Sequence, residues 1–130
     1  MVVEDDFFTQ QLIVSCLDTL CDCITADTTR KALVLYENKV PDLVLMDIEL
    51  PDGDGADAVK KICAADRNAF ILMLSAHSFQ DKVLNSLSCG AKGFIAKPFT
   101  KDRLVSQYQR FANWREEKKR YGTESVTQPA

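Results

Sequence analysis

Acidic side chains follow two short apolar runs of the sequence. Residues 4–6 (Glu-Asp-Asp) come directly after residues 1–3, and Asp47 closes the run at residues 43–46. Each run is typical of a buried parallel strand, and such strands hold ligand sites at their carboxyl ends. If the two strands are neighbours, three or four carboxylates converge, and their mutual repulsion favours a bound cation. An oxygen-rich acidic site of this kind suits Mg²⁺.

A lysine at the end of a third apolar run would complete this site. Lys97 follows residues 93–96 and directly precedes Pro98. If residues 93–96 form a strand of the same sheet, the lysine lies at the same edge as the carboxylates. The sequence therefore predicts one pocket that combines several carboxylates, a divalent cation and a lysine.

The elements that must position these residues alternate along the chain. Apolar residues recur at helical spacing after Asp6, and Thr28 or Thr29 can cap a helix that stops before Pro41. The last helix begins after its predicted cap at Thr100. Five such helices alternate with strands predicted at residues 1–3, 23–26, 43–47, 69–74 and 94–96. This alternation predicts a single-domain α/β fold with a doubly wound, five-stranded parallel sheet.

Length and charge limit the functions that this chain can have. Its 130 residues suit one domain, and a net charge of −3 with 46% hydrophobic residues gives no basic surplus for nucleic acid. No apolar stretch approaches the roughly 20 residues of a membrane span, and the sequence does not start like a secretion signal. We therefore expect a cytoplasmic protein that binds neither nucleic acid nor membrane through this segment.

The two ends of the chain carry further expectations. Only three residues precede the acidic cluster, so the first strand looks shortened and the domain could be excised from a longer chain. Residues 115–120 are mostly charged and are predicted to continue the last helix, whereas residues 121–130 are polar and are predicted to be a disordered tail.

The cysteines do not indicate a zinc site or a disulfide framework. There are five of them, an odd number, and none is paired in CxxC spacing, so we expect reduced and largely buried thiols. Cys21 and Cys23 flank Asp22 and would share one face of a strand, but no second pair is present to complete a zinc site.

Beyond these single residues, four sequence motifs and the spacing between them resemble the receiver domain of two-component response regulators, the CheY-like superfamily, over roughly residues 1–120. The motifs are VVEDD at 2–6, LVLMDIELPDGDG at 43–55, LSAHS at 74–78 and GAKGFIAKPF at 90–99. The resemblance implies a flavodoxin-like fold with strand order 2-1-3-4-5. That order places the ends of the first and third strands side by side, in agreement with the single pocket inferred above.

The resemblance also implies roles for the residues at the acidic strand ends. Asp47 would be the phosphoacceptor, attacking the phosphorus of a phosphohistidine donor to give an acyl phosphate. Mg²⁺ would be bound by Asp5 and Asp47 directly, by the backbone carbonyl of Glu49, and by Glu4 through water.

By the same resemblance, Lys97 and Ser75 would contact the phosphoryl group, and Ser75 and Phe94 would form the switch that reports phosphorylation. Pro98 is expected to follow a cis peptide bond. The responding surface would comprise the fourth helix, the fifth strand and the last helix, around residues 79–115. Glu49 and His77 occupy positions that flank the approach of water and could tune dephosphorylation, although both could equally be solvated loop residues.

The function predicted in this way is a phosphoacceptor signalling module with Mg²⁺ as its cofactor. A histidine kinase or phosphotransfer protein would supply the phosphoryl group, a downstream protein or domain would respond, and phosphorylation-linked dimerisation is left open. The chain would catalyse only its own phosphorylation and slow autodephosphorylation, and so would not be an enzyme in the usual sense.

Other functions are weighed against this prediction. Within the family, the chain could be a receiver excised from a hybrid histidine kinase or multidomain regulator. A non-phosphorylated flavodoxin-like binding module is disfavoured because no glycine-rich phosphate loop follows the first strand. A haloacid-dehalogenase-type phosphatase would need Asp5 as nucleophile and a second aspartate two residues later, where Phe7 stands instead.

Overall fold

A five-stranded parallel sheet forms the centre of the computed structural model, which describes residues 1–76, 85 and 87–121. Its strand order is β2-β1-β3-β6-β7. The strands are β1 (Val2–Val3), β2 (Thr25–Ala26), β3 (Val44–Asp47), β6 (Ile71–Ser75) and β7 (Gly93–Ala96). Numbered within this sheet alone, the order is 2-1-3-4-5, so the predicted fold class and topology are confirmed.

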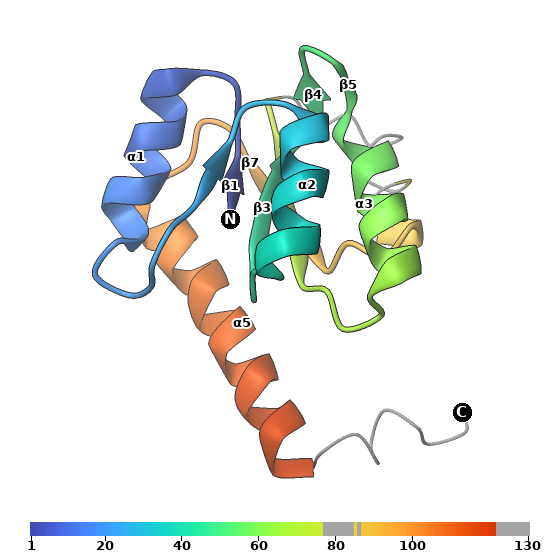
Figure 1. Cartoon of the computed structure of the whole chain (residues 1–130). Helices are drawn as coiled ribbons and strands as arrows, with labels where there is room; N and C mark the ends of the chain where they lie inside the picture. The colour runs from blue at the N-terminus through green and yellow to red at the C-terminus, as the bar shows by residue number, and fades with distance from the viewer. Residues whose placement is uncertain (77–84, 86, 122–130) are drawn as a thin grey trace.

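Helices cover both faces of the sheet (Figure 1). They are α1 (Phe7–Leu17), α2 (Thr29–Lys39), α3 (Gly55–Ala65) and α5 (Lys101–Tyr121). Helices α1 and α5 pack on one face, and α2 and α3 pack on the other. The predicted fourth helix falls mostly outside the described residues, although residues 85, 87 and 88 are helical.

Successive strand residues enter opposite layers of the core. In β1, Val2 packs with residues of α1 and α5, whereas Val3 packs with residues of α2 and α3. In β3, Leu45 likewise packs with residues of α1 and α5, and Met46 packs with residues of α2 and α3. A parallel sheet covered on both faces needs apolar residues at every strand position, which explains the unbroken apolar runs of the sequence. Each fully buried side chain of this size contributes about 1.5–3 kcal/mol.

The threonine caps predicted for the second and last helices are confirmed, and Asp6 caps a further helix. Asp6 is the N-cap of α1, and Thr28 rather than Thr29 is the N-cap of α2. At the start of α5, the backbone N–H of Arg103 donates to the hydroxyl of Thr100 at 3.1 Å. Each cap satisfies a backbone donor that a helix start would otherwise leave unpaired.

A small antiparallel sheet occupies the segment after Asp47, which is rich in proline, glycine and aspartate. It consists of β4 (Glu49–Leu50) and β5 (Gly53–Asp54), which pair with each other. The backbone N–H of Gly55 donates to the carbonyl oxygen of Ile48 at 2.7 Å and closes the segment. The residues between these two strands therefore reverse the chain in a hairpin.

The prediction of largely buried cysteines is wrong for four of the five. All five thiols are free, but only Cys16 is buried. The half-buried thiols are Cys21, Cys23, Cys63 and Cys89. Cys21 and Cys23 lie in the segment between α1 and β2 and pack only partly buried against the core.

The last helix is anchored to the sheet by an aromatic and cationic cluster. The ring of Trp114 lies 5.0 Å from that of Phe70, measured between centroids. The Nζ atoms of Lys92 and Lys118 lie 5.5 and 5.2 Å from the centre of the Trp114 ring. Beyond this cluster α5 continues to Tyr121 and projects past the sheet (Figure 1), as predicted for its charged end. Within the described part of the chain, no helix combines the length and apolarity needed to cross a membrane.

Gly55 is a position where the backbone of this fold leaves no room for a side chain. A Cβ atom there would lie 2.0 Å from the backbone oxygen of Asp47. We predict that Gly55→Ala lowers the free energy of unfolding by about 1–3 kcal/mol, because the Asp47 backbone must move. Urea unfolding measures the loss, with Lys60→Ala on the exposed side of α3 as the control. An unchanged unfolding midpoint for Gly55→Ala would contradict this packing.

Candidate functional site

Strand register brings the acidic residues together. Val3 of β1 pairs with Met46 of β3, so the next residues, Glu4 and Asp47, lie level at the carboxyl ends of neighbouring strands. Asp5 joins them, and one carboxylate oxygen from each of the three lies within 4.8 Å of the others. The single acidic pocket predicted from the sequence is therefore present.

Lys97 reaches this cluster from the end of β7. Its Nζ atom lies 3.2 Å from Oδ2 of Asp47 and also donates to Oε1 of Glu4. Its backbone N–H donates to the carbonyl oxygen of Ser75 at 2.6 Å, and the Lys97–Pro98 peptide bond is cis. The ammonium group thus lies between two carboxylates, whose residues are only 1% (Glu4) and 5% (Asp47) exposed.

Burial and neighbouring charges shift the protonation of two members of the cluster. Burial disfavours the charged form of Lys97, but the hydrogen bond to Glu4 and the charge of Asp47 outweigh it and raise the pKa of the ammonium group. Desolvation and a hydrogen bond with Glu4 raise the pKa of the Asp5 carboxyl. The rise in the pKa of Lys97 reflects the negative charge of its carboxylate neighbours, which a divalent cation would also offset.

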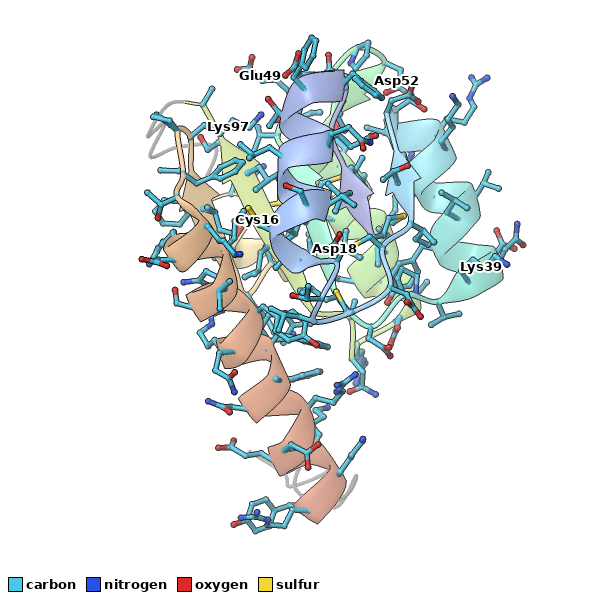
Figure 2. The ribbon with its side chains drawn as sticks, turned by 90° about the vertical axis from the view of Figure 1, so that its left-hand side faces the viewer. Cys16, Asp18, Lys39, Glu49, Asp52 and Lys97 are labelled. Carbon is cyan, nitrogen blue, oxygen red and sulfur yellow. The ribbon has the colours of Figure 1, made fainter. Side chains whose placement is uncertain are left out.

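The cluster forms one side of a cleft with a volume of about 290 Å³. The backbone N–H of Glu49 donates to Oδ1 of Asp47 at 3.2 Å, which holds the start of the following loop over the strand end. Ser75, at the end of β6, is buried and also lines the cleft. In Figure 2, Glu49, Asp52 and Lys97 lie at the same end of the molecule.

The remaining residues predicted for the site lie elsewhere or cannot be placed. Phe94 is half-buried and packs against the core between the sheet and α2 and α3. It does not line the cleft around Asp47. His77 lies outside the described residues.

Two residues that support the site were not predicted. The carboxylate of Asp52 accepts hydrogen bonds from the backbone N–H groups of Thr29 and Arg30, at 2.8 and 3.0 Å, and from the hydroxyl of Thr29 at 2.9 Å. Gln10 is buried, and its side-chain amide donates to the carbonyl oxygen of Glu4 at 3.0 Å. The hydrogen bonds of Asp52 tie the segment after Asp47 to the start of α2. The only feature of the sequence that pointed to this contact was the turn-rich composition around Asp52.

Comparisons with known proteins agree with this fold and site. Residues 1–109 match the response regulator receiver domain family, and the chain belongs to that family. Among curated relatives, the chemotaxis protein CheY of Thermotoga maritima is 35% identical over 107 residues, which are 81% of this chain and 89% of the relative. CheY of Bacillus subtilis is 35% identical over 115 residues, or 87% and 96% of the two chains.

A solved structure extends the likeness to three dimensions. The receiver domain of NtrX from Brucella abortus matches with a TM-score of 0.80 and 29% identity, covering 85% of this chain and 94% of that one. The protein is therefore a receiver domain of two-component systems, with a phosphoacceptor signalling function. Receiver domains generally bind Mg²⁺ in an acidic pocket, and the cluster of Glu4, Asp5 and Asp47 fits that chemistry.

Loss of the Lys97 charge should destabilise the metal-free protein. We predict that Lys97→Met lowers its free energy of unfolding by about 1–3 kcal/mol, because Glu4 and Asp47 remain buried without their cation. Urea unfolding in a chelator measures the effect, and Lys101→Met, at an exposed position, is the control. Added Mg²⁺ should reduce the difference. Equal stability of the Lys97 and Lys101 variants would show that the ion pairs contribute little.

Proposed function

We propose that Asp47 is the phosphoacceptor of this receiver domain. The observation that carries the proposal is the position of its carboxylate, which opens on the cleft between two other carboxylates and the ammonium group of Lys97. Both oxygens have orienting partners, since Oδ1 accepts from the Glu49 N–H and Oδ2 pairs with Lys97. An anionic nucleophile held in this way is positioned before the donor arrives.

The transfer forms one bond and breaks one. A carboxylate oxygen of Asp47 attacks the phosphorus of a phosphohistidine, the P–N bond breaks, and the imidazole nitrogen leaves with the bonding electron pair. The product is an acyl phosphate on Asp47. Lys97 offsets the charge on the phosphoryl oxygens, and the hydroxyl of Ser75 at the neighbouring strand end donates to one of them.

The acidic cluster would hold Mg²⁺ for this reaction. The direct ligands would be Asp5, Asp47 and the backbone carbonyl of Glu49, with Glu4 acting through water, as in the family that the chain belongs to. When bound, the ion supplies positive charge against the phosphoryl oxygens. The hairpin after Asp47 fixes the position of Glu49, whose carbonyl would help to determine where the ion binds.

The phosphoryl group would act as a switch. It adds about −1.5 to −2 charges beside Ser75 at the end of β6, and β6 pairs with β7, which carries Phe94. We infer that Ser75 and Phe94 couple the phosphorylated site to an output surface around residues 79–115, part of which lies outside the described residues. Glu49, exposed at the rim of the cleft, and His77 would tune the access of water.

The donor would be a histidine kinase or phosphotransfer protein, and a downstream protein or domain would read the switch. Next to the acidic cluster, Phe7 and Phe8 at the start of α1 are 64% and 81% exposed. Two neighbouring exposed aromatic rings beside a reactive cleft favour docking of a protein donor. Catalysis by this chain would be limited to its own phosphorylation and slow autodephosphorylation.

Phosphorylation by a small donor tests the nucleophile. Incubated with acetyl phosphate and Mg²⁺, the protein should gain one phosphoryl group by intact mass, and Asp47→Asn or a chelator should abolish the gain. Asp57→Asn, which removes an exposed carboxylate from α3, is the control and should be phosphorylated normally. Phosphorylation that requires Asp5 as nucleophile and survives in Asp47→Asn would favour the phosphatase-like alternative.

A neighbouring pair of aspartates tests the metal ligands. Asp5→Asn should raise at least tenfold the Mg²⁺ concentration that gives a half-maximal phosphorylation rate, because a direct anionic ligand is lost. Asp6→Asn should leave that concentration within about twofold, because Asp6 caps α1 and asparagine caps equally well. Similar Mg²⁺ dependence in the two variants would exclude Asp5 as a ligand.

A further inference from the structure

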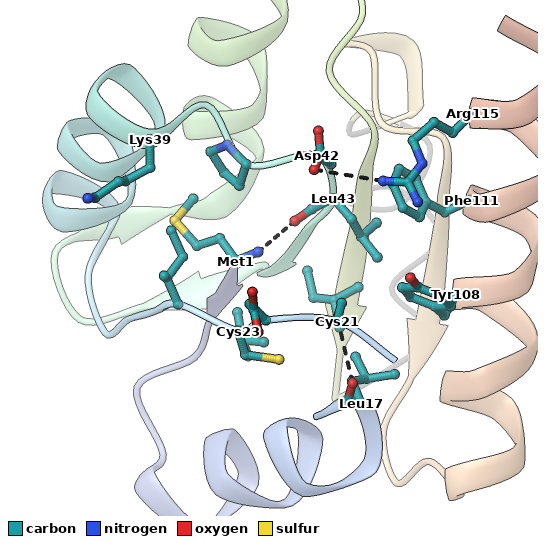
Figure 3. Close-up of a pocket in the computed structure, with 15 residues that line it drawn as sticks. Met1, Leu17, Cys21, Cys23, Lys39, Asp42, Leu43, Tyr108, Phe111 and Arg115 are labelled. Carbon is teal, nitrogen blue, oxygen red and sulfur yellow. Dashed lines mark hydrogen bonds and ion pairs between the residues drawn. The ribbon is translucent and has the colours of Figure 1, made fainter. Parts of the chain in front are cut away.

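Cys21 and Cys23 lie in a second cavity, remote from the acidic cleft. They belong to the segment that joins α1 to β2 and line a cavity of about 230 Å³ together with Leu17 and Tyr108 (Figure 3). Leu43, directly before β3, also lines the cavity, which therefore lies at the amino ends of the strands. The phosphoacceptor site lies at their carboxyl ends, so this cavity takes no part in it.

The two thiols interact with each other. Both thiols line the same cavity with one residue between them in the sequence, and the Cys21 thiol donates to the carbonyl oxygen of Leu17 at 3.6 Å. Burial, followed by the adjacent Cys23 thiol, raises the pKa of Cys21 to about 11. Two thiolates this close together repel each other, and a cation bound between them would remove that repulsion.

The ligand count excludes most metals. Over residues 1–76, 85 and 87–121, the one group of three or more potential His, Cys, Asp or Glu ligands is the acidic cluster at Asp47. Zinc sites in proteins almost always use three or four such ligands. Thiolates select soft ions, and Cu(I) is the common biological ion that two thiolates can satisfy.

We propose that Cys21 and Cys23 form a two-thiolate binding site for Cu(I). Binding forms two Cu–S bonds and releases the two thiol protons, with no change in the oxidation state of copper or sulfur. The half-buried position at the wall of the cavity leaves the thiols within reach of a small ion. The site is independent of phosphorylation.

Transfer of Cu(I) from a coloured chelator tests the proposal. The reduced, metal-free protein is titrated without oxygen into the Cu(I) complex of bicinchoninate, whose absorbance falls as copper leaves. The wild type should take up one Cu(I) per chain, and Cys21→Ser and Cys23→Ser should each bind at least tenfold more weakly. Cys63→Ser and Cys89→Ser, which alter half-buried thiols elsewhere, should bind like the wild type.

Two further measurements keep the result unambiguous. Circular dichroism and phosphorylation by acetyl phosphate should be unchanged in the Cys21 and Cys23 variants, which would show that lost binding is not lost folding. Zn²⁺ should bind no more tightly to the wild type than to the double serine variant. The proposal is overturned if the wild type takes no copper from the chelator, if the double serine variant takes as much, or if Zn²⁺ binds through the same thiols with equal strength.

Discussion

The contact of Lys97 with Glu4 and Asp47 is the interaction on which the rest of this site depends. Two carboxylates about 5 Å apart repel each other by about 3 kcal/mol at an effective dielectric constant of about 20, and three of them lie at this strand edge. The ammonium group between Glu4 and Asp47 offsets that cost. Since 93 positions separate Glu4 from Lys97 in the sequence, only the parallel sheet brings them together.

The segment after Asp47 is held in place by contacts with two helices. Asp54 caps α3, Asp52 binds the first turn of α2, and Gly55 permits the close approach of the chain to the Asp47 carbonyl. One loop therefore joins the acidic pocket to two helices on the same face of the sheet. A change in charge at Asp47 would therefore act on a segment that is hydrogen-bonded to the starts of α2 and α3.

Local sequence patterns predicted the strand ends and helix caps because those features depend on neighbouring residues. The apolar run before Asp47 and the cap at Thr28 are of this kind. Contacts across many residues left no local signal. The binding of the α2 backbone by Asp52 depends on tertiary register alone. Cys21 lies in neither a helix nor a strand, because α1 ends at Leu17 and β2 begins at Thr25.

The functional roles of the site residues were inferred in a different way from the fold. The acidic pocket with its lysine followed from the residues themselves, but the assignment of Asp47 as nucleophile and Ser75 as phosphoryl ligand came from resemblance to a family. Geometry shows that Ser75 and Asp47 line one cleft. Whether Asp47 is phosphorylated depends on the phosphoryl donor, which is a separate molecule that neither the sequence nor the fold identifies.

Trp114 gives this molecule a built-in spectroscopic reporter. It is the single tryptophan of the chain. It lies among Phe70, Lys92 and Lys118 at the amino ends of the strands, whereas Asp47 lies at their carboxyl ends. Indole emission responds to the distance and orientation of nearby cations, so a shift of α5 against the sheet would change its intensity or wavelength. Because an ion or phosphoryl group in the acidic cleft is too remote to quench the indole directly, any change in emission on phosphorylation would report a movement transmitted through the whole domain.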